Sequence, residues 1–148
     1  MLDPGDFVLI DQSGRVITGR HQPSSERWMH IAAYSERTDV MAAIHAHPPA
    51  TVLTVAGLSM SRSAPCRRSF SHSVRCPRPP TPHRPRRGAV VVRDLIKRFD
   101  AARCSIDTGS ITVGKTVRDA FFKLEKLEHG CHVMLMAHQL RPGTKPAA

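Results

Sequence analysis

The sequence has few aromatic residues, no long apolar run and no regular cysteine pattern. Only 5% of its 148 residues are Phe, Trp or Tyr, and no run of about 18 apolar residues predicts a membrane span. The four cysteines are irregularly spaced, which argues against a disulfide framework or a structural zinc knuckle. The first residues lack the basic and apolar regions of a signal peptide. We therefore expect a cytoplasmic protein with reduced cysteines and no membrane partner.

One internal segment, residues 61–88, contains no Asp, Glu or Lys. It holds eight Arg, six Pro and five Ser, and it supplies most of the formal net charge of +10. Such a composition cannot bury a core, so we expect an irregular segment that interrupts one domain over residues 1–140, followed by a disordered tail at 141–148. Clustered arginines can bind phosphate backbones, but the segment has no interleaved aromatic residue beyond Phe70. We therefore expect no nucleic-acid partner.

A histidine pair lies in residues 42–49, Ala-Ala-Ile-His-Ala-His-Pro-Pro. In a strand, residues two apart share a face, so His45 and His47 can point at one ion. Imidazole is a common ligand of Zn²⁺ and neighbouring transition metals. Pro48 and Pro49 cannot continue a sheet ladder, so the pair lies where a strand ends. The simpler alternative is two half-exposed histidines at a strand end.

A second motif, Pro-Ser-Ser-Glu at residues 23–26, precedes a helix that we expect from Glu26 to about Arg37. Ser24 or Ser25 is a suitable N-cap for this helix. Free N–H groups at the helix start, together with two hydroxyls, suit a phosphate or another anion, and Glu26 can reach the same space. The simpler alternative is an ordinary capped helix with a solvated glutamate.

Hydrophobic periodicity predicts the remaining elements. Residues 7–10 are expected to form a short buried strand that pairs with residues 15–18 as a hairpin. Further strands are expected at 40–44 and 110–113, and helices at 50–56, 89–101 and 116–137. The buried stripe of the first helix is predicted to contain Trp28, Ile31 and Ala32. That of the last helix is predicted to contain Val117, Ala120, Phe121, Leu124, Leu127, Cys131 and Leu135.

Together these motifs resemble the class II aldolase/adducin family. The resemblance covers residues 1–60, with the Pro-Ser-Ser-Glu and His-x-His-Pro-Pro elements, and it resumes at about 88–140. It implies an α/β fold, a three-layer αβα sandwich with a mixed, mostly antiparallel sheet, here incomplete. The best-known enzyme of the family cleaves L-fuculose 1-phosphate, so the resemblance implies a homotetrameric, zinc-dependent lyase for a sugar phosphate.

The resemblance also implies roles for five residues. His45 and His47 correspond to metal ligands, Glu26 to the acid/base carboxylate near the metal, and Ser24 and Ser25 to phosphate contacts. The cation would stabilise the enediolate that forms when the carbon–carbon bond breaks. Related sugar-phosphate 4-epimerases have Asp where this chain has Glu26, which favours an aldolase. A non-catalytic, adducin-like interaction module is the competing interpretation.

The third histidine of the family is missing from its expected place. Residues 102–109 read Ala-Arg-Cys-Ser-Ile-Asp-Thr-Gly, but one permitted codon choice, read two nucleotides further in, gives Ala-Leu-Leu-Asp-Arg-His-Gly. In the present frame the position falls near Asp107. Residues 79–88 likewise give Pro-Tyr-Ala-Thr-Pro-Ser-Thr-Glu-Gly at the same offset, which resembles the family's tyrosine-containing stretch. We infer a displaced reading frame across the middle of the chain.

A displaced frame predicts an impaired enzyme. The chain would lack the third histidine and the tyrosine, and we expect it to begin after the family's upstream phosphate-contacting segment. Weak metal binding and little or no turnover follow from these losses. The identity of the substrate is left open.

Overall fold

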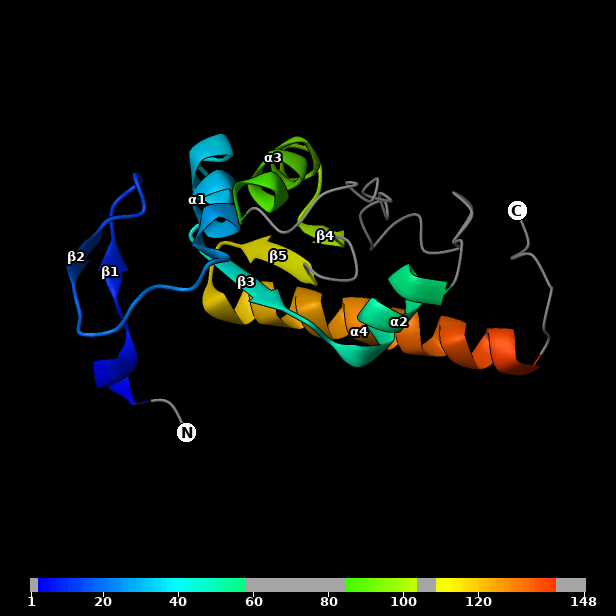
Figure 1. Ribbon diagram of the computed structural model, residues 1–148. Coiled ribbons are helices and arrows are strands. Elements are labelled where there is room, and N and C mark those ends of the chain that lie inside the picture. Colours follow the sequence, from blue (N-terminus) through cyan, green and yellow to red (C-terminus); the bar gives the residue numbers. More distant parts are fainter. Residues whose placement is uncertain (1–2, 58–84, 104–108, 141–148) are drawn as a thin grey trace.

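The computed structural model describes residues 3–57, 85–103 and 109–140. Three layers form the body of the molecule (Figure 1). Helices α1 (Arg27–Glu36) and α3 (Pro85–Ile96) pack together on one face of a sheet. Helix α4 (Val117–Leu140) covers the opposite face, and the short helix α2 (Pro49–Gly57) packs on α4. This αβα arrangement confirms the predicted fold class.

The central sheet has three strands in the order β3-β5-β4. Strand β5 (Ser110–Gly114) is fully buried between β3 (Ala42–Ala46) and β4 (Ala101–Arg103), and both pairings are antiparallel. Each position of β3 pairs with one of β5, from Ala42 opposite Gly114 to Ala46 opposite Ser110. The end of β3 that carries the histidines is therefore fixed to the beginning of β5.

The core lies between the sheet and the pair α1 and α3. A helix face packed on β-branched strand residues removes apolar area from water, at roughly 25 cal/mol per Å². The buried residues of this core are Met29, Ala33, Val40, Val92, Leu95, Ile96, Ala102, Ile111 and Val113. A smaller cluster joins α2 to α4 through Ala50, Leu127 and Cys131.

Three helices differ from their expected boundaries or faces. Helix α3 begins at Pro85, earlier than predicted, and ends at Ile96, because the chain turns and enters strand β4 at Ala101. That strand was not predicted. The expected stripe of α1 is wrong in part, because Met29, Ala32 and Ala33 are its buried residues. Of the stripe predicted for α4, four residues are buried and Val117 and Phe121 are exposed.

The N-terminal hairpin forms as expected, but it is not buried. After the short helix η1 (Pro4–Asp6), strands β1 (Leu9–Ile10) and β2 (Val16–Thr18) pair antiparallel and stand apart from the sheet (Figure 1). Phe7 is 71% exposed and Leu9 is 55% exposed, so the prediction that residues 7–10 form a buried strand is wrong. A two-stranded ribbon has no second layer to cover its apolar side chains.

Several predictions concern residues outside the described ranges. The Arg-rich segment, apart from its last residues in α3, lies there, as do Asp107 and the tail at 141–148. Within the described part of the chain, none of the helices has the length and apolar character needed to cross a bilayer.

Candidate functional site

His45 lies on β3 with its ring oriented by the neighbouring strand. Its Nδ1 is 2.9 Å from the carbonyl oxygen of Ser110. A carbonyl can only accept, so Nδ1 carries the proton and donates this hydrogen bond. The other ring nitrogen, Nε2, is buried and has no hydrogen-bond partner among the described residues. A buried polar atom left without a partner costs free energy, so this orphaned nitrogen needs an explanation.

His47 lies just beyond the end of β3 and is exposed. Its ring is 5.0 Å from that of His45, centroid to centroid, at an interplanar angle of 79°. Gly109 closes the space behind it, with a φ of +60° that favours glycine. A Cβ at Gly109 would lie 2.9 Å from Cδ2 of His47. The predicted histidine pair is therefore brought together by the start of β5.

The environment of His45 favours its neutral form. Burial lowers the pKa of His45, and the positive charge that His47 can carry lowers it further. The hydrogen bond to Ser110 and the carboxylate of Glu26 oppose this shift in pKa. Burial likewise lowers the pKa of His30, which lies on α1 with its ring centroid 6.5 Å from that of His45. A neutral imidazole is the form that binds a cation.

The Pro-Ser-Ser-Glu segment forms the turn that leads into α1. The N-cap position is occupied by Glu26, so the expectation that Ser24 or Ser25 caps the helix is wrong. Ser24 instead forms a turn, in which its Oγ accepts from the Glu26 N–H at 3.2 Å and its carbonyl accepts from the Arg27 N–H at 3.2 Å. Both serines are exposed. Their hydroxyls are therefore accessible to a ligand in solution.

Glu26 acts electrostatically on His45, but within the described residues it does not complete a cation site with the two histidines. Glu26 is near enough to raise the pKa of His45. Among the described residues, however, no group of three His, Cys, Asp or Glu side chains is arranged to hold a metal ion. His45 and His47 therefore supply two candidate imidazole ligands, and Glu26 does not form a group of three with them in the described part of the chain.

Sequence reasoning did not find three residues that support this site, namely Gly109, Ser110 and Glu128. Glu128 lies on α4 and accepts hydrogen bonds from the start of α2, directly after the histidines. One signal could have indicated such a partner. The stretch His-Pro-Pro-Ala-Thr begins a helix with no local capping side chain, so the capping group must come from elsewhere in the chain.

The comparison with known protein families decides the classification. Residues 1–135 match the family model described as "Class II Aldolase and Adducin N-terminal domain". The chain belongs to the class II aldolase and adducin family. The resemblance seen in the sequence is confirmed.

Two curated relatives have different named activities. Methylthioribulose-1-phosphate dehydratase of Methylococcus capsulatus is 30% identical over 139 residues, which cover 86% of this chain and 68% of the relative. 5-deoxy-D-ribulose 1-phosphate aldolase of Bacillus thuringiensis is 44% identical over 46 residues, which cover 31% of this chain and 22% of the relative. Each match covers only part of the relative, and both relatives are named for a ketose phosphate.

A solved structure supports the fold. L-fuculose-1-phosphate aldolase from Thermus thermophilus superposes with a TM-score of 0.73 at 21% identity, covering 99% of this chain and 76% of that chain. At this level of identity the likeness concerns the fold. The chain is thus a class II aldolase-type domain, and its family supports a lyase-type enzyme.

Proposed function

We propose that the chain is a metal-dependent lyase domain for a sugar phosphate, in which His45 and His47 bind a divalent cation such as Zn²⁺. The observation that carries the proposal is the state of His45. Its Nδ1 donates to the Ser110 carbonyl, and its buried Nε2 has no hydrogen-bond partner in the part of the chain that the structure describes. Metal-ligating histidines typically donate the N–H of one ring nitrogen to a carbonyl or carboxylate, which fixes the tautomer and leaves the other nitrogen for the metal.

The spacing of the two rings supports a shared ion. Two imidazoles bound to one tetrahedral cation at about 2.0–2.1 Å have ring centroids about 5 Å apart. The rings of His45 and His47 are 5.0 Å apart. His47 is also exposed, so a cation there would be accessible to a substrate.

The residues before α1 would supply the other functions. The hydroxyls of Ser24 and Ser25, at the positive end of the helix, suit the phosphate group of the substrate. The carboxylate of Glu26 would move a proton to or from the reacting part of the substrate, and it would also approach the cation. When bound, the cation would oppose the negative charge that develops on the carbonyl oxygen as the carbon–carbon bond breaks.

We further propose that this copy is impaired. A catalytic zinc site usually has three protein ligands, and the described residues provide two imidazoles and no complete group of three. Weak metal binding and low turnover are expected for this reason. Assembly as a homotetramer and a cytoplasmic location remain parts of the proposal.

A dehydratase is the second candidate. It is favoured by the similarity to methylthioribulose-1-phosphate dehydratase, which covers 86% of this chain. Both reactions draw electrons toward a carbonyl next to the reacting carbon, so the same histidines and carboxylate can serve either one. They differ in the bond that breaks, which is carbon–carbon in the aldolase and carbon–oxygen in the dehydratase. A 4-epimerase is less favoured because Glu26 stands where those enzymes have Asp, and an adducin-like module would need no metal.

The test measures metal binding and product in the same preparations. Metal-free protein is titrated with Co²⁺ by visible absorbance, and Zn²⁺-loaded protein is incubated with L-fuculose 1-phosphate, 5-deoxyribulose 1-phosphate or methylthioribulose 1-phosphate. Two fragments indicate an aldolase, whereas loss of one water indicates a dehydratase. His45→Asn is expected to weaken Co²⁺ binding at least about 100-fold, and His129→Gln, on the exposed side of α4, is the matched control.

Equal Co²⁺ affinity in the wild type and His45→Asn would refute the metal site. Stoichiometric tight metal with rapid cleavage would refute the impairment. Glu26→Gln separates the chemistry from binding, because it should abolish the remaining turnover and change Co²⁺ affinity less than His45→Asn does.

A further inference from the structure

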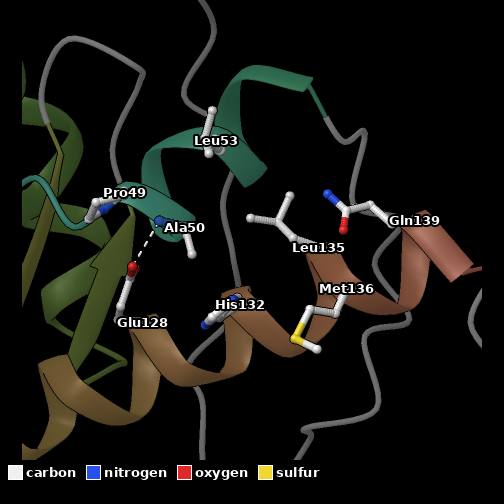
Figure 2. Close-up of a pocket in the computed structure, with 8 residues that line it drawn as sticks. All are labelled: Pro49, Ala50, Leu53, Glu128, His132, Leu135, Met136 and Gln139. Carbon is white, nitrogen blue, oxygen red and sulfur yellow. Dashed lines mark hydrogen bonds between the residues drawn. The ribbon is translucent and has the colours of Figure 1, made fainter.

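Glu128 holds the beginning of α2 from a distant part of the chain. Its Oε1 accepts from the Ala50 N–H at 2.8 Å, and its Oε2 accepts from both the N–H and the hydroxyl of Thr51, each at 2.8 Å. The bond to Ala50 crosses one end of a cavity of about 300 Å³ between α2 and α4 (Figure 2). Ala50 is 6% exposed and Thr51 is 1% exposed, so the donors of these bonds are buried, while Glu128 itself is half-buried.

The start of α2 depends on this carboxylate. The first N–H groups of a helix have no partner within the helix. Pro48, which precedes the helix, has no side-chain oxygen that could cap it, and Pro49 has no N–H at all. A negative carboxylate at the positive end of a helix forms short, charge-assisted hydrogen bonds and interacts favourably with the helix dipole.

This contact is directly connected to His47. On one side of His47, β3 ends at Ala46, whose backbone pairs with Ser110. On the other side, two prolines separate His47 from Ala50, and each proline ring fixes the backbone angle φ. The histidine backbone is therefore held between a paired strand end and the helix start that Glu128 fixes.

We propose that Glu128 is a positioning residue for the metal centre, acting through the N-terminus of α2 to fix His47 beside His45. The inference depends on the proposed function, because it assumes that both histidines bind the cation. Glu128 itself does not touch the cation. It reduces the freedom of His47, so that the site is formed before the ion arrives and less ordering is needed on binding.

The experiment compares Co²⁺ affinity, read from visible absorbance, in metal-free wild type and variants. Glu128→Ala is expected to weaken binding about 10- to 100-fold. Glu128→Gln, which keeps one acceptor oxygen, should weaken it less, and it carries the test if Glu128→Ala does not fold. Glu125→Ala, an exposed glutamate on the same helix, should leave Co²⁺ affinity unchanged.

Two further variants separate positioning from general stability. Leu124→Ala removes a buried side chain of α4 that does not belong to the cluster joining α2 to α4, so it should lower the melting temperature and leave Co²⁺ affinity unchanged. In a His47→Asn background, Glu128→Ala should have no additional effect on affinity, because the residue through which it acts is gone. Hydrogen exchange of the Ala50 and Thr51 amides should rise in Glu128→Ala without any metal.

The outcomes distinguish the two proposals. If Co²⁺ binding depends on His45 and His47 but is unchanged in Glu128→Ala and Glu128→Gln, the role of Glu128 is overturned and the metal site stands. Equal losses of affinity in Glu128→Ala and Leu124→Ala would also overturn it. If Co²⁺ binding does not depend on His45, the metal site fails and the positioning role fails with it.

Discussion

The two halves of the candidate site are held in different ways. The histidine half, His45 and His47, depends on residues far away in the sequence. Ser110 accepts the hydrogen bond from the ring of His45, and Glu128 holds the helix that follows His47. Gly109 leaves room for the His47 ring. The geometry of this half therefore exists only when the sheet and α4 have formed.

The hydroxyl half, Ser24, Ser25 and Glu26, is held by bonds within its own turn. The Glu26 N–H donates to Ser24 Oγ, and the Arg27 N–H donates to the Ser24 carbonyl. Both serines are exposed. Substitutions in β5 or α4 should therefore disturb the geometry of the histidine half. Substitutions in the hydroxyl half should have little effect on the stability of the fold.

The largest effect is expected from Gly109→Ala. Gly109 has a φ of +60°, and its new Cβ would overlap the Ala46 carbonyl and lie 2.9 Å from the His47 ring. We expect the free energy of unfolding to fall by at least about 2 kcal/mol, because left-handed strain and a backbone clash add together. Urea denaturation measures this change, and Co²⁺ titration should show weaker binding in the fraction that remains folded.

Gly5→Ala is the control for that substitution. A Cβ at Gly5 would lie 3.2 Å from the end of the flexible Arg20 side chain, which can move away. The expected change is less than about 0.5 kcal/mol. Similar losses of unfolding free energy at Gly5 and Gly109 would contradict the view that the histidine half is the tightly built one.

The histidine half shows how much of a site can be predicted from local patterns. The spacing of His45 and His47, with two prolines after them, predicted a strand end, and β3 ends at Ala46. The neighbour that orients His45 could not be predicted, because Ser110 is 65 residues away and the pairing register of β3 with β5 decides the contact. Register depends on the whole sheet and not on either strand alone.

Errors elsewhere in the fold have the same origin. The apolar residues predicted for the first hairpin strand, such as Phe7 and Leu9, indicated burial, yet no layer covers them in the described part of the chain. Periodicity over residues 89–101 predicted one helix, but Ala101 and Ala102 pair with β5 and are buried in the sheet. Alternation over so few residues cannot distinguish a helix end from a short strand.

An effect of intermediate size is expected from the double change Ser24→Ala and Ser25→Ala. If the hydroxyl half binds the phosphate of the substrate, the loss of two exposed donors should weaken binding of inorganic phosphate about 10- to 100-fold, since each hydrogen bond contributes about 0.5–1.5 kcal/mol net. Co²⁺ affinity should stay as in the wild type. Phosphate titration followed by NMR measures the first quantity, and visible absorbance measures the second.

Ser35→Ala is the matched control, because Ser35 is an exposed hydroxyl at the other end of the same helix α1. It should change neither affinity. A double variant that loses Co²⁺ affinity while Ser35→Ala does not would show that the two halves are coupled and are not held independently.

The smallest effect is a difference in pH dependence between the two regions of the molecule. Burial lowers the pKa of His30 and of His45 below the ordinary value of 6.5. The unfolded chain then binds more protons than the folded one as pH falls below 6.5, so stability from these groups is complete above that pH and declines below it.

In the hairpin, hydrogen bonds led by that from the Ser13 hydroxyl lower the pKa of Asp11 from 3.8 to about 2. Its contribution is therefore kept until the pH falls below 3.8, and it is lost as the pH passes through about 2.

Urea denaturation of metal-free protein between pH 8 and 4.5 tests this difference. The charged groups that act on His45 are His47 and Glu26, and neither is altered in the variants compared. His30→Asn with His45→Asn should flatten the decline in unfolding free energy below pH 6.5, because the groups that take up the protons are gone. Asp11→Asn should leave that part of the profile unchanged, since the carboxyl of Asp11 is still ionised there. If the decline persists in the histidine double variant, or disappears in Asp11→Asn, then burial of His30 and His45 is not the cause of the loss of stability below pH 6.5.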